Sequence, residues 1–413
     1  MTERRARILH SINEIEARVW NRCANPEGLP FNPFLSHEFF SALEESGSAC
    51  TETGWQPFHL VLEEGADAGQ SGPGTQVLGT VPMYVKGHSQ GEYVFDHAWA
   101  DAWHRAGRNY YPKLQVSVPF TPATGRRLLS ADAGPATDAA LLSACAQICE
   151  QVELSSAHIT FMPKDQWQTA GELGYLQRID QQYHWHNPGY RSFDDFLADL
   201  SAKKRKNLRR ERREALENGI SIEWVSGDDL TESHWDAFYR FYLDTGGRKW
   251  GSPYLTRSFF SHISATLAEH VLLILCRREG RYVAGALNFI GTDTLYGRNW
   301  GAVEYHPFLH FETCYYQAID FAIERGLKRV EAGAQGSHKV ARGYLPEATY
   351  SAHWIRDPEF RRAVAHYLRS ERAHVTHDIE YVEQHAPFRN GVDLSTVRGI
   401  VLKPDQDADT TTR

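Results

Sequence analysis

Apolar and polar residues alternate most clearly in the second half of the chain. Three consecutive apolar-rich segments predict strands at 271–277, 282–290 and 294–300. A stretch with apolar residues near a 3.6-residue period then predicts a long helix at 309–325, closed by a glycine, and a short strand follows at 329–332. The pattern therefore predicts an antiparallel meander, a helix and a returning strand.

The first half shows the same order of elements with a weaker pattern. Turn residues separate its predicted elements, which are helices at 37–43, 99–106, 136–150 and 166–173 and strands at 58–62, 76–86, 92–96, 114–118, 157–162 and 175–185. No repeat is visible at the level of residues, so two related halves are expected from element order alone. Mixed layers of this kind belong to the α+β class.

One long helix is predicted between the halves. Ser192 and Asp195 match a capping box, apolar residues follow at helical spacing, and the polar stretch KKRKNLRRERREALEN continues to Gly219. The remaining predicted elements are a strand at 220–225, helices at 232–244 and 257–270, an extended segment at 349–355 and a helical tail.

Composition restricts the class of protein. The 413 residues are 42% hydrophobic with a formal net charge of -8, which fits a packed protein and excludes one that is basic overall. The longest apolar runs are far shorter than the roughly 18 residues of a membrane helix, and Glu14 and Glu16 lie where a signal peptide needs an apolar core. Six scattered cysteines form no CxxC pair and predict reduced thiols. We therefore expect a cytoplasmic protein.

The densest group of chemically active side chains lies in EAGAQGSHKVARGY, residues 331–344. The stretch begins as a strand and breaks at a glycine, after which Gln335, His338, Lys339 and Arg342 follow within eight positions. Lysine and arginine can hold a phosphate or stabilise a tetrahedral oxyanion, and histidine can move protons near neutral pH. The alternative is a polar strand-to-loop junction with solvated charges.

A second group lies in LYGRNWG, residues 295–301. Tyr296, Arg298 and Trp300 alternate there with other residues and are expected to share one strand face. An arginine beside a tryptophan can form a cation–π pair or an anion site.

Glu312 lies near the start of the predicted helix that follows. It is either a carboxylate favoured by the helix dipole or a general base or ligand for an acceptor amine. His306 and His310 have the spacing of a zinc site, but Pro307 disfavours a regular helix there. No metal is expected.

A third group is the basic run from Lys203 to Arg213, in which eight of eleven residues are lysine or arginine. Solvated charge is the ordinary explanation of such a run. The alternative is contact with a polyanion through residues such as Lys203, Arg205 and Arg209. That polyanion would be a nucleotide diphosphate, an RNA backbone or an anionic lipid surface.

The first half also contains an aromatic, turn-rich region at 88–127. Its residues either pack as an aromatic core or line a cleft, and the candidates for the cleft are Asp96, Asp101, His104, Tyr110, Tyr111 and Lys113. Several common motifs are absent from the chain: GxSxG, the P-loop, GxGxxG after a strand, HExxH and paired CxxC. Their absence argues against hydrolases of the α/β type, nucleotide triphosphatases, simple dehydrogenases and zinc ribbons.

At these residues the chain resembles the FemAB-like bacterial N-acyltransferases, the family of peptidoglycan biosynthesis and recognition. The resemblance covers about residues 10 to 390 and is carried by NPFLSHEFFSALEESGS, KGHSQGEYVFDHAWADAW, YYPKLQVSVPFTPATGRRLL, LYGRNWGAVE, LHFETCYYQAI and EAGAQGSHKVARGYLP. It implies two tandem domains of the acetyltransferase (GNAT) fold, which we place at 1–190 and 191–395, with the catalytic cluster in the second and a flexible tail at 396–413.

FemAB-type relatives move an aminoacyl group from charged tRNA to an amine of a cell-wall peptide precursor. A lysine after the late strand of their second domain supports the transition state, and Lys339 matches it best. Two departures are visible. HPFLHFET stands where acetyl-CoA users carry their pyrophosphate motif, and no heptad pair resembles the helical arm of the cell-wall ligases.

The sequence therefore predicts an N-acyltransferase without a bound cofactor, whose donor is an acyl-CoA or an aminoacyl-tRNA. Lys339 and His338 are expected to stabilise the oxyanion or move a proton, and Glu312 to act on the amine. The expected donor or acceptor contacts are Arg298, Arg342, Gln335, Tyr296, Trp300, Lys203, Arg205 and Arg209.

Three alternatives stay open. In the first alternative, the acceptor is a lipid amine, the donor is a long-chain acyl-CoA, and the basic run contacts the inner membrane. Or the protein recognises cell-wall precursors without catalysis. Or it binds RNA through the basic run alone, with a steep dependence on salt.

Overall fold

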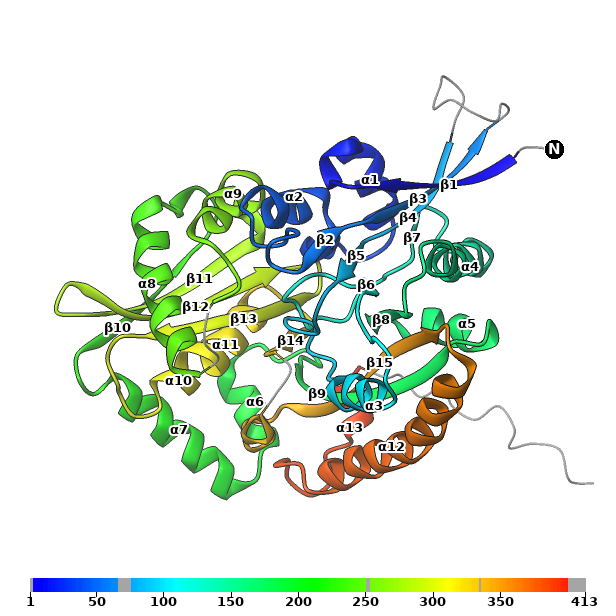
Figure 1. Ribbon diagram of the computed structural model, residues 1–413. Coiled ribbons are helices and arrows are strands. Elements are labelled where there is room, and N and C mark those ends of the chain that lie inside the picture. Colours follow the sequence, from blue (N-terminus) through cyan, green and yellow to red (C-terminus); the bar gives the residue numbers. More distant parts are fainter. Residues whose placement is uncertain (1–2, 66–75, 250–252, 334–335, 400–413) are drawn as a thin grey trace, which may run out of the picture.

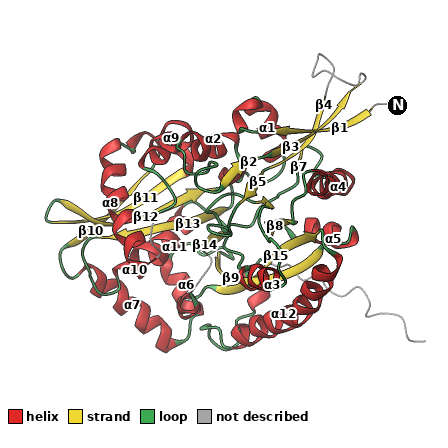
Figure 2. Ribbon diagram, viewed as in Figure 1, coloured by secondary structure: helices red, strands yellow, loops and turns green. Residues whose placement is uncertain are grey.

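The computed structural model describes residues 3–65, 76–249, 253–333 and 336–399. An eleven-stranded sheet runs across the molecule, with helices packed around it (Figures 1 and 2). In spatial order its strands are β10 (Ile220–Val225), β11 (Val271–Arg278), β12 (Arg281–Ile290), β13 (Thr294–Ala302), β14 (Arg329–Glu331), β9 (Leu176–His186), β15 (Leu345–Ile355), β8 (Ser156–Met162), β6 (Lys113–Val116), β5 (Met83–Lys86) and β2 (Trp55–Pro57).

A second, four-stranded sheet lies at the N-terminal end. Its strands are, in order, β1 (Glu3–Leu9), β3 (His59–Gly65), β4 (Gln76–Val81) and β7 (Leu129–Ser130). The α-helices are α1 (Ala17–Ala24), α2 (His37–Glu45), α3 (His97–Arg105), α4 (Pro135–Gln151), α5 (Lys164–Glu172), α6 (Phe193–Asp199), α7 (Ala202–Leu216), α8 (Glu232–Lys249), α9 (Arg257–Leu267), α10 (Leu309–Phe311), α11 (Gln317–Glu324), α12 (Pro358–Gln384) and α13 (Leu394–Val397). None of the helices in these ranges is both long and apolar enough to cross a membrane.

The two halves of the chain share strands at the centre of the large sheet. β9, from the first half, pairs with β14 and β15 of the second, and β15 inserts between β9 and β8. Each half also contributes one parallel pair of neighbouring strands joined through a helix: β6 with β8, and β13 with β14. The architecture is therefore the predicted α+β class, with two GNAT-like halves that complete one continuous sheet.

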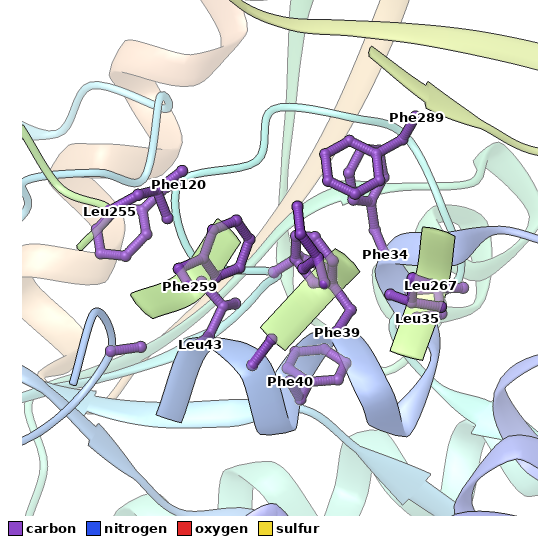
Figure 3. Close-up of a cluster of buried hydrophobic side chains, with 14 of the residues drawn as sticks. Phe34, Leu35, Phe39, Phe40, Leu43, Phe120, Leu255, Phe259, Leu267 and Phe289 are labelled. Atoms are coloured by element: carbon purple, nitrogen blue, oxygen red, sulfur yellow. The ribbon is translucent and has the colours of Figure 1, made fainter. Parts of the chain in front are cut away.

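Packing divides the helices between the two faces of the sheet. A large apolar cluster joins α1, α2, α8 and α9 to one face, and Figure 3 shows part of it, where Phe34 and Phe39 of the first half meet Phe259 and Phe289 of the second. The ring centroids of Phe34 and Phe289 are 5.0 Å apart. On the opposite face α4 and α5 cover the first half, and α6, α7 and α11 cover the second. Aromatic contacts between the halves hold their relative positions.

Two predicted elements are divided in the structure. The helix expected from Ser192 to Gly219 is two helices, because Leu200 is extended and pairs with Phe388, and the Ser201 amide donates to the Pro387 carbonyl at 2.9 Å. The C-terminal segment thus takes the backbone groups that a continuous helix would use. The strand expected at 76–86 is divided at Pro82 into β4 and β5, which lie in different sheets.

Other predictions were wrong or incomplete. Residues 92–96 form a turn rather than a strand, with Tyr93 at a φ of 59°. The helix expected at 309–325 contains a π-helical turn over Glu312–Tyr316. β1 and α1 were not predicted, because β1 is rich in charged residues and α1 spans only eight residues. Of the flexible tail expected at 396–413, Thr396 and Val397 belong to α13, and residues 400–413 lie outside the described residues.

Candidate active site

The parallel strands β13 and β14 separate after a short contact. They pair at only three positions, from Thr294 with Arg329 to Tyr296 with Glu331, and β13 then continues to Ala302 beside β12 alone. Gly297 stands at the fork, where an added Cβ would lie 3.4 Å from the Glu331 carbonyl oxygen. A cavity of about 90 Å³ lies at this splay. Its lining includes Gly297, Trp300, His310, Cys314, Tyr315 and Ala332.

A β-bulge in β13 makes the side chains before and after it point to different faces of the sheet. Asn288 of β12 pairs with Gly297 and Leu287 pairs with Asn299, so Arg298 is an extra residue without a register partner. Tyr296 packs against Phe34 on the α2 side, whereas Trp300 packs against His310 on the α10 side. The expectation that Tyr296, Arg298 and Trp300 share one face is therefore wrong for Trp300.

Arg298 is held on the α2 side of the sheet. Its guanidinium donates to the Phe120 carbonyl and lies 5.9 Å from the centre of the Phe34 ring. Burial lowers its pKa, and its interactions with Tyr93, Tyr242 and Glu331 oppose that shift. A desolvated guanidinium with few hydrogen bonds is suited to an incoming anion. Burial also raises the pKa of the nearby Tyr296 phenol, which keeps it neutral.

Lys339 lies in the 3₁₀ turn η6 (Ser337–Arg342), which follows the fork. Its side chain is 1% exposed, and Nζ donates to the Gly333 carbonyl at 2.8 Å. Burial lowers the pKa of Lys339 to about 8, and an interaction with Cys314, which lines the splay cavity, opposes the shift. The geometry thus holds a buried ammonium group next to the splay with no carboxylate among its described hydrogen-bond partners.

Arg342 fixes this turn to the helices beside it. Its guanidinium donates to Glu211 of α7 at 2.9 Å and to the His338 carbonyl at 2.8 Å, and it stacks 3.4 Å from the centre of the Phe311 ring. The Tyr316 hydroxyl donates to the same Glu211 carboxylate. Glu211 therefore links η6 to both α7 and the π-helical turn.

His338 lies at the surface of the site. It is exposed, and its Nε2 lies 2.9 Å from the Tyr315 hydroxyl, with the His310 ring 6.3 Å away. Gly336 comes just before it at a φ of 116°, where a Cβ would lie 2.5 Å from the imidazole. Gln335, the other predicted member of this motif, lies outside the described residues.

Glu312 is buried and fully engaged by other side chains. Arg212 of α7 donates to both carboxylate oxygens, at 2.9 and 3.2 Å, and Gln317 donates at 2.8 Å. Burial raises the pKa of Glu312, and the guanidinium opposes that shift. The bidentate pair ties the π-helical turn to α7. The role of Glu312 as a general base stays a prediction.

The basic run has two faces in the structure. Glu211 and Arg212 point inward to the site, whereas Lys203 and Arg209 lie on the exposed or half-exposed outer side. Arg209 pairs with Asp194 at 2.8 Å. A shallow hollow of about 300 Å³ along this outer side is lined by Ala202, Arg205, Lys206, Arg209, Arg210 and Arg213.

Glu331 was not predicted as a site residue, although it begins the strongest motif. It ends β14 at the fork, is 3% exposed, and its Oε1 lies 3.4 Å from Arg329 Nε. Its Oε2 is buried without a hydrogen-bond partner among the described residues. Burial raises the pKa of Glu331 to about 7. The position of a glutamate between an apolar strand and a glycine turn was the signal available in the sequence.

The aromatic region of the first half contains a buried polar network around Lys113. Lys113 Nζ donates to Asp96 at 2.5 Å, to Glu92 at 2.7 Å and to Ser89 at 2.8 Å, and the Tyr110 hydroxyl donates to Asp96 at 2.6 Å. Asp101 and His104 lie exposed on α3. The network holds the turn at 89–96 against β6.

The shared strands, the splay of β13 from β14 and the helix between them define the class: a tandem GNAT-fold protein. The chain belongs to the FemAB-like family, described as peptidoglycan biosynthesis/recognition, which it matches over residues 11–390. No curated protein matches it.

Three solved structures align with most of the chain at low sequence identity. FemX aligns with a TM-score of 0.52 and 12% identity, over 87% of this chain and 100% of that one. L-PGS from Bacillus licheniformis aligns with a TM-score of 0.47 and 11% identity, over 83% and 99% of the two chains. A tandem GNAT protein from the clavulanic acid biosynthesis pathway aligns with a TM-score of 0.46 and 10% identity, over 86% and 99%.

Proposed function

We propose that the protein transfers an acyl or aminoacyl group from an ester or thioester donor to an amine acceptor. The observation that carries this proposal is Lys339, a buried ammonium group next to the strand splay whose Nζ donates to the Gly333 carbonyl. A cation held in a dry site stabilises an oxyanion far better than one in water. Because its pKa is about 8, Lys339 is mostly charged at neutral pH.

In this proposal the donor carbonyl enters the splay from the α10 side, where the cavity lies. Attack by the amine forms the C–N bond and a tetrahedral oxyanion, which Lys339 stabilises. Arg342 fixes the turn that carries Lys339, and Glu312 anchors the helix behind it. His338, exposed and beside the Tyr315 hydroxyl, is positioned to pass a proton to the leaving oxygen or sulfur.

An aminoacyl-tRNA donor is favoured over an acyl-CoA by the outer side of α7. Its hollow collects the cations Arg205, Lys206 and Arg209, which suit a nucleic-acid backbone. The helix after the splay gives poor support for a pyrophosphate, because α10 spans only Leu309–Phe311 and leads directly into a π-helical turn.

For the acceptor, the description of the family points to an amine of a cell-wall peptide precursor. Arg298, on the face opposite α10, would bind a carboxylate or phosphate of that acceptor. A lipid amine on an anionic membrane surface is the second acceptor class, and the same basic side of α7 supports it. The donor, the acceptor and a cytoplasmic location stay proposals.

The test measures donor binding and transfer together. We expect aminoacyl-tRNA to bind more tightly than uncharged tRNA, and more weakly as salt rises. Lys339→Ala should bind the donor as the wild type does but lose transfer by about 10²-fold to 10³-fold. Lys328→Ala, an exposed lysine, is the matched control.

Saturable binding of long-chain acyl-CoA, with no preference for charged tRNA, would show that the donor is an acyl-CoA rather than an aminoacyl-tRNA. A lipid amine would then be the acceptor to test. Full transfer activity in a folded Lys339→Ala variant would overturn the proposal. Binding of a cell-wall precursor without any turnover would make the protein a recognition module.

A further inference from the structure

Two buried carboxylates flank the β13–β14 splay from opposite faces of the sheet. Glu312 lies on the α7 and α11 side, and Glu331 on the α2 side with its register partner Tyr296. Residues paired across neighbouring strands share a face. The splay cavity is lined by His310, Cys314 and Tyr315 of the first side and also by Arg298, whose guanidinium is held on the second. In the proposed reaction the donor binds on the first side and the acceptor on the second.

The two carboxylates differ in what holds them. Glu312 receives a bidentate guanidinium and an amide. Glu331 has a long contact with Arg329, at 3.4 Å, an interaction with the Thr124 amide, and a buried Oε2 without a hydrogen-bond partner in the described part of the chain. A buried polar atom left without a partner costs free energy unless a ligand or a functional role accounts for it. Glu331 is therefore the carboxylate that can receive a proton.

The loop at 117–127 covers Glu331 on the acceptor side and is held by groups from both halves. Gln182 of β9 donates to the Pro122 carbonyl at 2.8 Å, and Arg127 donates to the carbonyls of Ala123 and Thr160 at 2.8 and 2.9 Å. Arg298 donates to the Phe120 carbonyl of the same loop. This loop thus contacts both Arg298 and Glu331.

We propose that Glu331 is the general base that removes the proton from the acceptor amine. This role rests on the proposed transfer reaction. The ammonium of the acceptor gives one proton to the Glu331 carboxylate, and the free amine attacks the donor carbonyl carbon. The tetrahedral intermediate then collapses with cleavage of the C–O or C–S bond, and the second amine proton passes to the leaving group. Glu331 returns its proton to solvent.

The charges around Glu331 suit this role. Burial raises its pKa to about 7, while Arg329 and the Thr124 amide oppose the shift and Asp293 and Glu347 add to it. The other ionisable groups facing it are Tyr296, Arg127, Arg298 and His184 of the neighbouring strands and loop. The rate should therefore rise with pH through about 7 as Glu331 ionises, and fall above about 8 as Lys339 loses its proton.

The test compares two acceptor amines. With an alkylamine acceptor, which is charged at neutral pH, Glu331→Gln should lose about 10²-fold to 10⁴-fold in kcat and lose the acid limb of the pH profile. With hydroxylamine, which is uncharged at neutral pH, most of that loss should disappear. Glu331→Asp should keep the acid limb at a reduced rate. Glu63→Gln, another buried strand glutamate paired with Arg7, is the control.

Equal losses with both amines, at unchanged donor binding, would overturn the role and make Glu331 a structural residue. An acid limb that persists in Glu331→Gln would overturn it too. If Glu331→Gln does not fold, Glu331→Asp is the test. An acid limb kept at a reduced rate supports the role of Glu331 as the base, and an unchanged rate contradicts it. The proposed function fails separately, by an absence of transfer in the wild type with either amine.

Discussion

Lys113 in the first half and Lys339 in the second are both buried beside a parallel strand pair, and they are held in different ways. Lys113, at the start of β6, donates to two carboxylates and a hydroxyl. Lys339, after β14, donates to a single carbonyl. Burial alone would lower the pKa of both, but Glu92 and Asp96 outweigh burial at Lys113 and raise its pKa. At Lys339 burial prevails.

The difference separates a structural charge from an available one. Lys113 has a hydrogen-bond acceptor for each of its three ammonium protons and has none left for a ligand. A buried ammonium group with one neutral acceptor gains most when negative charge develops beside it. Lys113 therefore serves to stabilise the fold, whereas Lys339 is available to an oxyanion.

The largest expected effect is on stability in the first half. Lys113→Met leaves Glu92 and Asp96 buried without their cation, so we expect the free energy of unfolding to fall by about 3 to 5 kcal/mol. Denaturant unfolding at pH 7 measures it, with Lys328→Met as the exposed control. A loss no larger than that of the control would remove the structural role assigned to Lys113.

Lys339→Met should change stability in the opposite direction. The folded-state pKa of about 8 lies below the ordinary value of 10.5, so the folded protein binds fewer protons than the unfolded chain between these values. Wild-type stability should therefore rise with pH across this window, while that of Lys339→Met should not. Below pH 8 the variant should be more stable, by up to about 3 kcal/mol.

Thermal unfolding of both proteins from pH 6 to pH 10.5 tests the sign. A variant that is less stable than the wild type at pH 7 would show that Lys339 is held by interactions as strong as those of Lys113, and the contrast between the lysines would disappear.

Element order could be predicted from the sequence because it rests on local periodicity. The strands β11, β12 and β13 and the helix after them were correct because long apolar patterns decide them. The pairing of β9 from the first half with β15 from the second could not be predicted, since pairing between residues far apart in the sequence leaves no local pattern. The break at Leu200 has the same cause, because Phe388 and Pro387 create it.

The candidate site was predicted as a motif but not as a geometry. Lys339, His338 and Arg342 were found because reactive side chains gather after a strand. The orientation of the basic run was hidden, since its composition does not show that Glu211 and Arg212 turn inward. Glu331 was missed because the sequence does not show which of the two glutamates, Glu312 or Glu331, forms a bidentate pair with an arginine.

The smallest expected effect concerns the support of Lys339 rather than the lysine itself. Glu211 accepts from Arg342 and from the Tyr316 hydroxyl, so Glu211→Gln removes the charge that holds η6 against α7. We expect kcat to fall by about tenfold, which corresponds to about 1.4 kcal/mol, with KM for the donor nearly unchanged. Glu211→Asp should recover part of the loss. The matched control is Glu214→Gln on the same helix, whose carboxylate lies 3.6 Å from Arg210 at the surface. If the two variants lose activity equally, α7 acts only through its overall charge, and the turn carrying Lys339 does not depend on a side chain held from the helix.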